Sequence, residues 1–259
     1  SLQLSRLELS GLALEALLTE AGTIELRGFR TGGGLELQEW LETFLPNVQR
    51  VVLRDSRLSL ETPAGIFELA LELTLDRSGN SRQLQGRLRG DDLELALRAE
   101  GVGNPLRLQS WSGDVFVDAR SPRLEAFDEV WSQLRWPFRL AGEASAQFWL
   151  ARSEGDSSAT MRLDAQDLRL EERNEAWSLP IDALAFEAAL TQRARHWSLL
   201  TEDFHVERAN QVIDLDRAQF DWWGQALRMR VTDLELDDLP QLLAAAPGIP
   251  AGLRKALPD

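Results

Sequence analysis

The sequence predicts a mainly β protein: one long, curled antiparallel sheet, a groove- or taco-like meander of hairpins with a few short amphipathic helices. Apolar residues recur at every second position in many consecutive segments, as in Phe67, Leu69, Leu71 and Leu73. Turn sequences with glycine, proline or asparagine separate several of these segments. Because successive side chains of a strand point to opposite faces, such a sheet has one apolar and one polar face.

The first half of the chain contains ten segments with this period of two. The predicted strands span residues 2–4, 7–14, 23–29, 48–54, 57–61, 66–76, 81–89, 93–101, 106–111 and 114–119. The turn sequences at 63–65, 78–80 and 90–92 join neighbouring strands by short connections, which is typical of hairpins.

The second half repeats the same alternation. The predicted strands span residues 138–151, 158–166, 168–172, 177–180, 184–192, 197–200, 204–207, 211–215, 218–223, 226–231 and 233–237. The connections are again short, so the whole chain is predicted to be a meander.

Three segments change to the 3.6-residue period of an amphipathic helix. They are residues 35–45, 124–136 and 239–257, and each precedes or contains a proline near its end, at Pro46, Pro137 and Pro258. This weak repeat predicts a first groove segment at residues 1–122 and a second at residues 123–259. The chain starts inside a strand without an initiator methionine, and we interpret it as a fragment of a longer chain.

Composition narrows the classes of function. The 259 residues carry a formal net charge of −14, which argues against a nucleic-acid backbone as partner because phosphate binding needs a basic surface. The absence of cysteine excludes disulfides and thiolate metal sites and fits the periplasm and the cytosol equally well. No segment has 18 consecutive apolar residues, so no membrane-spanning helix is predicted.

Residues that could carry chemistry do not form a known constellation. His196 and His205 lie nine positions apart, without the further ligands that a metal site requires. The glycines at 32–34 precede a predicted helix but lack the Lys-Ser/Thr of a phosphate-binding loop. We therefore predict no enzymatic activity, no metal site and no cofactor. The nine tryptophans fit either core packing or the rim of an apolar groove, and the sequence leaves both open.

Three blocks of sequence resemble AsmA-like proteins. Residues 195–199, followed by 204–206 and 213–215, resemble the strand pairs of that family. Residues 228–236 followed by Leu239-Pro240, and residues 140–143 leading to 148–150, are similar to the YhdP-type branch. The likeness covers most of the chain as a diffuse pattern.

The resemblance implies a periplasmic protein of a Gram-negative bacterium, held in the inner membrane by an anchor absent from this chain. It further implies an apolar groove that conducts phospholipid between the inner and outer membranes and so supports outer-membrane integrity. Phospholipid acyl chains are the expected partner, other envelope proteins are unidentified, and the family has no catalytic motif to carry over.

The alternation leads independently to a similar expectation. An extended apolar face cannot stay exposed to water, so it must close on itself, pack against another layer, or hold an apolar ligand. We expect a lipid groove lined by Phe67, Leu69, Leu71, Leu73, Leu93, Leu95, Leu97, Val115, Val117, Phe148 and Leu150, with Trp40, Phe44, Phe127 and Trp131 as a helical plug. The alternative is a scaffolding domain whose apolar face is filled by its own side chains.

Overall fold

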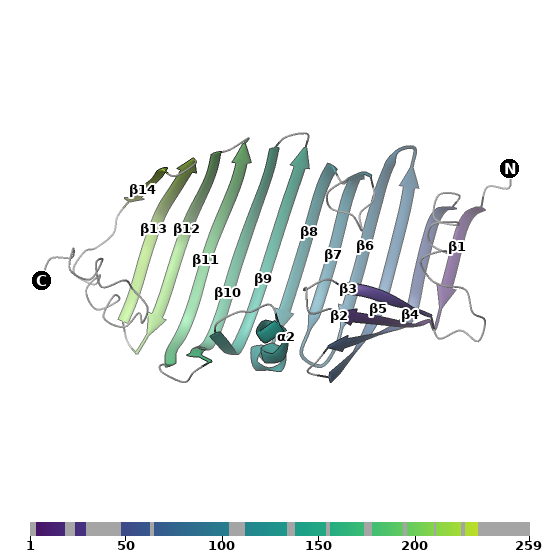
Figure 1. Cartoon of the computed structure of the whole chain (residues 1–259), viewed down its shortest axis with the longest axis horizontal. Helices are drawn as coiled ribbons and strands as arrows, with labels where there is room; N and C mark the ends of the chain where they lie inside the picture. Colours follow the sequence, from purple (N-terminus) through teal and green to yellow (C-terminus); the bar gives the residue numbers. More distant parts are fainter. Residues whose placement is uncertain are drawn as a thin grey trace, which may run out of the picture.

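The computed structural model describes residues 4–18, 24–29, 48–62, 65–103, 112–133, 138–153, 156–173, 178–193, 196–209, 211–223 and 226–232. One sheet of fourteen strands contains most of these residues (Figure 1), which confirms the predicted mainly β fold. The strands are β1 (Leu4–Ser10), β2 (Ala13–Leu18), β3 (Ile24–Phe29), β4 (Val48–Thr62), β5 (Gly65–Ser78), β6 (Ser81–Arg89), β7 (Glu94–Val102), β8 (Ser112–Ser121), β9 (Phe138–Ser153), β10 (Asp156–Glu172), β11 (Ser178–Arg193), β12 (His196–Arg208), β13 (Gln211–Trp223) and β14 (Ala226–Thr232).

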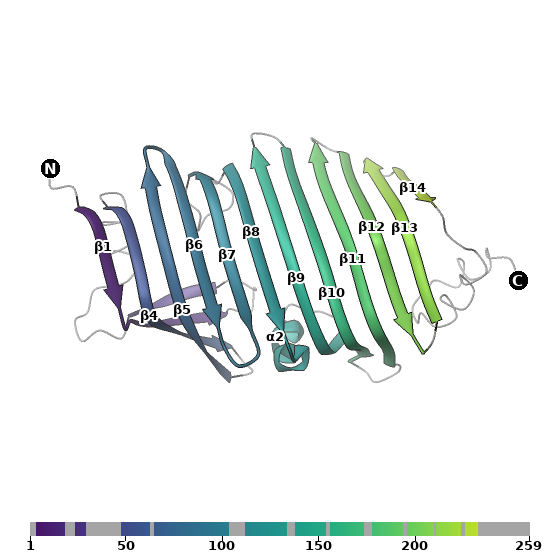
Figure 2. The same cartoon turned by 180° about the vertical axis from the view of Figure 1, so that it is seen from behind.

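From β4 to β14 each strand pairs antiparallel with the next strand along the chain. Figure 2 shows the same meander from behind. The N-terminal end differs, because β1 and β2 both pair with β4 in parallel, and β3 pairs antiparallel with β2. The sheet is therefore mixed at this end, while β8 and β9 keep it continuous across the boundary predicted at residue 122.

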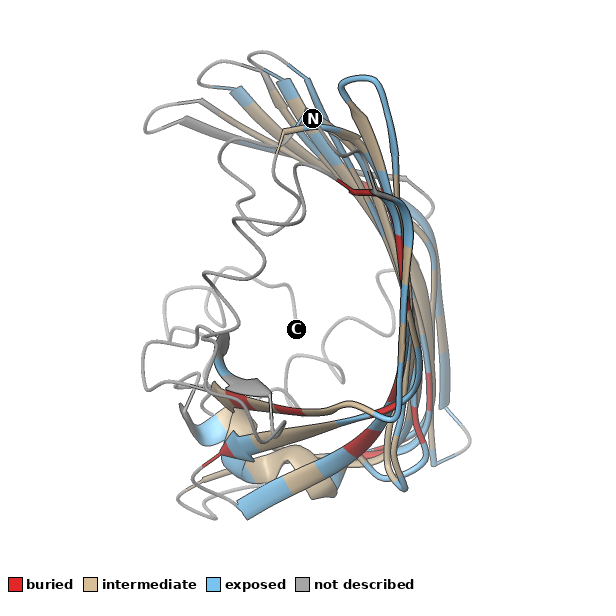
Figure 3. Ribbon diagram, turned by 90° about the vertical axis from the view of Figure 1, so that its right-hand side faces the viewer, coloured by how far each residue is buried: buried red, intermediate tan, exposed pale blue. Residues whose placement is uncertain are grey.

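The sheet curls into a trough (Figure 3), and bulges within its strands account for the bending. Register shifts occur on β4 between Leu53 and Ser56, between β9 and β10, and between β11 and β12. Asp55, Asp167 and Asp203 lie at these shifts with φ of 50°, 49° and 51°. Aspartate is one of the few residues besides glycine that adopts this left-handed conformation readily.

The bulges also explain where predicted strands differ from observed ones. The sequence predicts two strands at 48–54 and 57–61, but β4 is one strand that passes through the bulge at Asp55. β11 and β13, each predicted as two shorter strands, are also continuous. β10 and β12 pass through the bulges at Asp167 and Asp203, and each of them is likewise predicted as two shorter strands. A bulge adds a residue, so the alternation changes phase in mid-strand and imitates a turn.

One of the three predicted helices falls within the described residues. Residues 124–136 begin as a 3₁₀ turn, η3 (Leu124–Phe127), and continue as α2 (Asp128–Gln133). The predicted helices at 35–45 and 239–257 lie outside the described residues, as do the strands predicted at 106–111 and 233–237. No helix in the described ranges is long and apolar enough to cross a membrane.

Buried apolar side chains are few among the described residues. Ala165, Leu168 and Ile181 form one core cluster, against which Leu124 of η3 packs. At the N-terminal end, Leu14 and Ala16 of β2 are buried, as is Leu69 of β5. Most other apolar side chains of the described strands are only partly covered.

Candidate functional site on the inner face

Alternate residues of a strand point to opposite faces of the sheet, and residues that point to the same face are said here to share a phase. Phe67 of β5 shares its phase with Leu73 and Leu75, and its ring stacks on Phe127 of η3 at 5.8 Å and 9°. Because η3 and α2 lie inside the curve (Figure 3), this phase points into the trough. We call it the inner face, and the opposite phase the outer face.

Strand register joins the inner-face residues into rows that run along the trough. The first row crosses ten strands, from β5 to β14, and every member is apolar. It consists of Leu75, Leu84, Ala99, Val115, Leu150, Ala159, Leu190, Leu199, Phe220 and Met229. Ten strands at a spacing of about 4.8 Å span roughly 43 Å.

A second row runs beside the first, and on each strand its member lies two residues from the member of the first row. It consists of Leu73, Gly86, Leu97, Val117, Phe148, Met161, Ala188, Thr201, Ala218 and Val231. Its one hydroxyl group, on Thr201, donates to the Ala218 carbonyl oxygen at 3.2 Å. No side chain in either row is charged, and the hydroxyl group of Thr201 has a hydrogen-bond partner.

The two rows are incompletely covered. Among the row residues whose exposure is described, only Ala99 and Ala218 are buried, with 7% and 3% of their surface exposed. The large members, such as Leu97, Phe148 and Phe220, are half-buried. A row of half-buried leucine, valine and phenylalanine side chains along a trough is a surface that an apolar ligand can cover.

Charged side chains form cross-strand ion pairs on the outer face. Cross-strand ion pairs join Arg50 to Asp76 at 3.4 Å, Arg162 to Glu187 at 3.5 Å and Arg217 to Glu202 at 3.7 Å. The alternation predicts that Glu72, Glu94 and Arg98 lie outside, and the strand register places them on this outer face. Exposed pairs of this kind contribute little to stability, about 0–1 kcal/mol each.

Both histidines lie on the outer face beside a carboxylate of the next strand. His205 Nδ1 is 2.6 Å from Asp214 Oδ1, and His196 Nε2 is 3.6 Å from Asp221 Oδ1. Hydrogen bonding from Ser198 lowers the pKa of Asp221 below its ordinary value, and Gln219, His196 and Arg228 act in the same direction. Nowhere in the described ranges do three histidine or acidic side chains gather to hold a metal ion.

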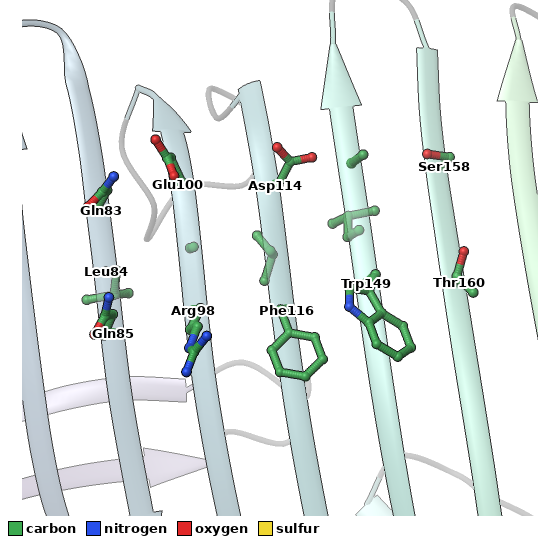
Figure 4. Close-up of a pocket in the computed structure, with 14 residues that line it drawn as sticks. Gln83, Leu84, Gln85, Arg98, Glu100, Asp114, Phe116, Trp149, Ser158 and Thr160 are labelled. Carbon is green, nitrogen blue, oxygen red and sulfur yellow. The ribbon is translucent and has the colours of Figure 1, made fainter.

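The outer face also has a shallow hollow of about 490 Å³ (Figure 4). Phe116 and Trp149 contact each other there at 5.1 Å, and Trp149 is 40% exposed. Polar groups such as Gln85 and Thr160 surround this pair. The hollow is separated from the two apolar rows by the thickness of the sheet.

The structure places nearly all predicted groove residues together. Phe67, Leu69, Leu71, Leu73, Leu95, Leu97, Val115, Val117, Phe148 and Leu150 share the inner face. Leu93 precedes β7, and its carbonyl oxygen accepts a hydrogen bond from the Gly90 N–H at 2.8 Å. Leu69 and Leu71 are 6% and 8% exposed, so they belong to the closed part of this face.

The predicted helical plug is described only in its second part. Phe127 stacks on Phe67, while Trp131 is half-buried and its Nε1 is buried without a hydrogen-bond partner in the described part of the chain. Trp40 and Phe44 lie outside the described residues.

Several inner-face residues are absent from the predicted set. The rows continue beyond β9 through residues such as Met161, Leu190 and Phe220, where the same alternation is present but interrupted by alanine and by bulges. The tryptophans divide between the faces: Trp149 lies outside, whereas Trp197 and Trp222 stack at 6.1 Å and 4° on the inner face near its edge.

Comparison with known proteins gives one family. The family model described as "YhdP protein" matches residues 1–259. No curated protein and no solved structure matches the chain.

Proposed function

This chain belongs to the YhdP family, and we propose that it is a segment of a bridge-like lipid transport protein whose inner face conducts phospholipid. In this proposal the complete protein is anchored in the inner membrane of a Gram-negative bacterium. It crosses the periplasm, delivers lipid between the inner and outer membranes, and thereby supports the integrity of the outer membrane.

The observation that carries the proposal is the continuity of the two apolar rows across ten strands. A ligand that lies along the trough meets leucine, valine, alanine or phenylalanine at each strand, with no charged side chain in its way. Each methylene group that leaves water contributes about 0.8 kcal/mol. An acyl chain placed along the rows would therefore be held wherever it lies.

The same rows favour movement. Hydrophobic contact is non-directional, so an acyl chain that slides by one strand spacing exchanges equivalent contacts and breaks no hydrogen bond. Such conduction needs no nucleophile, general base or metal ion, and we propose that this segment performs no catalytic step.

A second candidate is a scaffolding domain with a self-filled inner face. It is favoured by the lower part of the trough, where Leu124 and Phe127 of η3 already cover the sheet. In this case the two rows would be dry and would hold no lipid.

Neighbouring residues on opposite faces give the sharpest test. A photo-crosslinking amino acid at Leu97 in the complete protein in cells should form phospholipid adducts, and one at Arg98 should not. Adducts at both positions, or at neither, contradict conduction along the inner face. Native mass spectrometry of the purified chain adds an independent readout, because co-purified phospholipid is expected from a lipid groove and not from a dry scaffold.

A further inference from the structure

The outer-face hollow in Figure 4 lies over the middle of the sheet, where β6 to β10 run side by side. Strand register arranges its outer-face lining in two rows. The aromatic row has two rings at its centre and consists of Gln85, Arg98, Phe116, Trp149 and Thr160. The polar row lies two residues away on each strand and consists of Gln83, Glu100, Asp114, Ala151 and Ser158.

The two rings form an apolar platform that is open to solvent. Trp149 is 40% exposed, and every other aromatic side chain whose burial is described is more covered. Its ring lies against that of Phe116, with the centroids 5.1 Å apart and an angle of 38° between the planes. This contact restricts the orientation of the indole, so the platform has a defined direction.

The space beside the indole exists because the next outer-face residue of β9 is Ala151, whose side chain is a methyl group. Asp114 and Ser158 lie directly opposite Ala151 on the two neighbouring strands. The hollow of about 490 Å³ falls within the range of small-ligand sites, roughly 300–1,000 Å³. A second hollow of about 380 Å³ shares these three residues and continues toward the β9–β10 hairpin.

Polar side chains on the two sides of the aromatic row are used differently. On the side away from the polar row, Gln147 donates to Asp118 at 3.4 Å. Arg162 there pairs with Glu187 at 3.5 Å. Within the described part of the chain, no hydrogen bond or ion pair involves the polar side chains of the two rows at the hollow, those of Gln83, Gln85, Arg98, Glu100, Asp114, Ser158 and Thr160. These groups are available to a ligand.

The charges at the hollow favour a neutral ligand rich in hydrogen-bond donors. Glu100 and Asp114 lie directly opposite each other, and like charges in such positions destabilise a strand pair. A ligand that donates to these carboxylates is therefore favoured, whereas Arg98 alone does not balance them for an anion. An apolar protein side chain on Trp149 would bury the polar row without partners, which costs free energy.

We propose that the hollow binds a neutral glycan chain of β-1,4-linked pyranoses. A pyranose ring with equatorial substituents has an apolar face of axial C–H groups and an edge of hydroxyl groups, which both donate and accept hydrogen bonds. The indole of Trp149 covers that face, and the polar row meets the hydroxyl edge. Equatorial β-1,4 linkages give a straight chain, which matches two adjoining hollows along β9. The site is separate from lipid conduction, because it lies on the opposite face of the sheet.

The test measures oligosaccharide binding to the full chain by isothermal titration calorimetry. The probes are cellohexaose and chitohexaose, which are both β-1,4-linked, and the control ligand is maltohexaose, an α-1,4-linked glucose oligomer of the same length. Trp149→Ala removes the platform, and Ala151→Leu fills the hollow while the indole stays in place. The matched controls on the outer face of β5 are Ile66→Ala, at an exposed apolar residue, and Ala70→Leu, at an exposed alanine. Circular dichroism checks that each variant is folded.

The wild type is expected to bind at least one of the two β-1,4-linked probes, and to bind maltohexaose at least tenfold more weakly. Trp149→Ala and Ala151→Leu should each weaken that binding at least tenfold, whereas the two β5 controls should match the wild type. No binding of either probe at millimolar concentration, unchanged binding in Trp149→Ala, or an equal loss in the controls would each overturn the glycan site.

Two further outcomes would assign the hollow to another occupant and overturn the inference. The first is self-association of the wild type in analytical ultracentrifugation that Trp149→Ala abolishes, which would indicate a second copy of the chain. The second is binding to phosphatidylcholine vesicles that depends on Trp149, which would indicate a membrane surface. Native mass spectrometry of Trp149→Ala should show unchanged phospholipid occupancy, and a loss of lipid together with glycan would contradict a separate site on the outer face.

Discussion

A Cβ atom on Gly142 of β9 would lie 2.5 Å from the carbonyl oxygen of Asp167 on β10. Gly142 has φ of 113° and Asp167 has φ of 49°, and both lie at the register shift between these strands. The bulge on one strand thus requires a residue without a side chain on the next. The curvature of the trough depends here on a matched pair of residues rather than on one.

We therefore expect Gly142→Ala to destabilise the protein by roughly 2–4 kcal/mol, because it combines strain at a positive φ with overpacking against backbone. Urea unfolding followed by circular dichroism measures the change. Gly86→Ala is the control: its nearest neighbouring atom is 3.8 Å from the added Cβ, so little change is expected. Equal effects of both substitutions would show that the close approach at Gly142 is unimportant.

A charge in the middle of the second row should expel lipid. Leu97→Glu places a carboxylate in contact with hydrocarbon, at a cost of about 3 kcal/mol, which corresponds to about a 100-fold loss of affinity. Native mass spectrometry with added phospholipid measures the occupancy. Ala96→Glu introduces the same group on the outer face and should retain lipid; a similar loss there would contradict the assignment of faces.

The stacking of Phe127 on Phe67 should stabilise the packing of η3 against the sheet. Phe127→Ala removes a half-buried ring and an aromatic pair worth about 0.5–1.5 kcal/mol beyond its buried area, so we expect a total loss of roughly 2–3 kcal/mol. Thermal unfolding provides the readout. Ser132→Ala, at an exposed position of α2, should leave the midpoint unchanged. A midpoint shift no larger for Phe127→Ala than for Ser132→Ala would mean that η3 does not stabilise the sheet.

Asp221 should make the stability of the outer face depend on pH. Its pKa is lowered in the folded protein, chiefly by hydrogen bonding from Ser198, whereas an unfolded aspartate titrates near pH ~3.9. Its contribution is therefore fully present above the unfolded pKa and is lost as the pH falls through the folded value. The stability difference between the wild type and Asp221→Asn should shrink between neutral pH and pH ~3; a constant difference in urea titrations would contradict this.

Alternation predicts the fold class and half of the inner face because buried and exposed side chains must alternate on a one-sided sheet. It fails where a bulge changes the phase. Asp55, Asp167 and Asp203 each end a predicted strand or lie in a gap between two, although the observed strand continues through them. A single aspartate between two alternating runs of opposite phase is the signal that distinguishes a bulge from a turn.

The parallel pairing of β1 and β2 with β4 had no local signal in the sequence. It joins residues distant in the chain, and a period of two is the same in parallel and antiparallel strands.

The parallel docking of β1 and β2 on β4 also sets an order of folding. From β4 to β14, each new strand closes a short hairpin onto the strand before it, so its loop-closure entropy is small and the growing edge serves as a template. β2 can pair first with β3, but neither β1 nor β2 can dock on β4 until β4 has been made. β1, whose partner is β4, must therefore wait for that partner, and the N-terminal edge of the sheet depends for its assembly on residues that follow it.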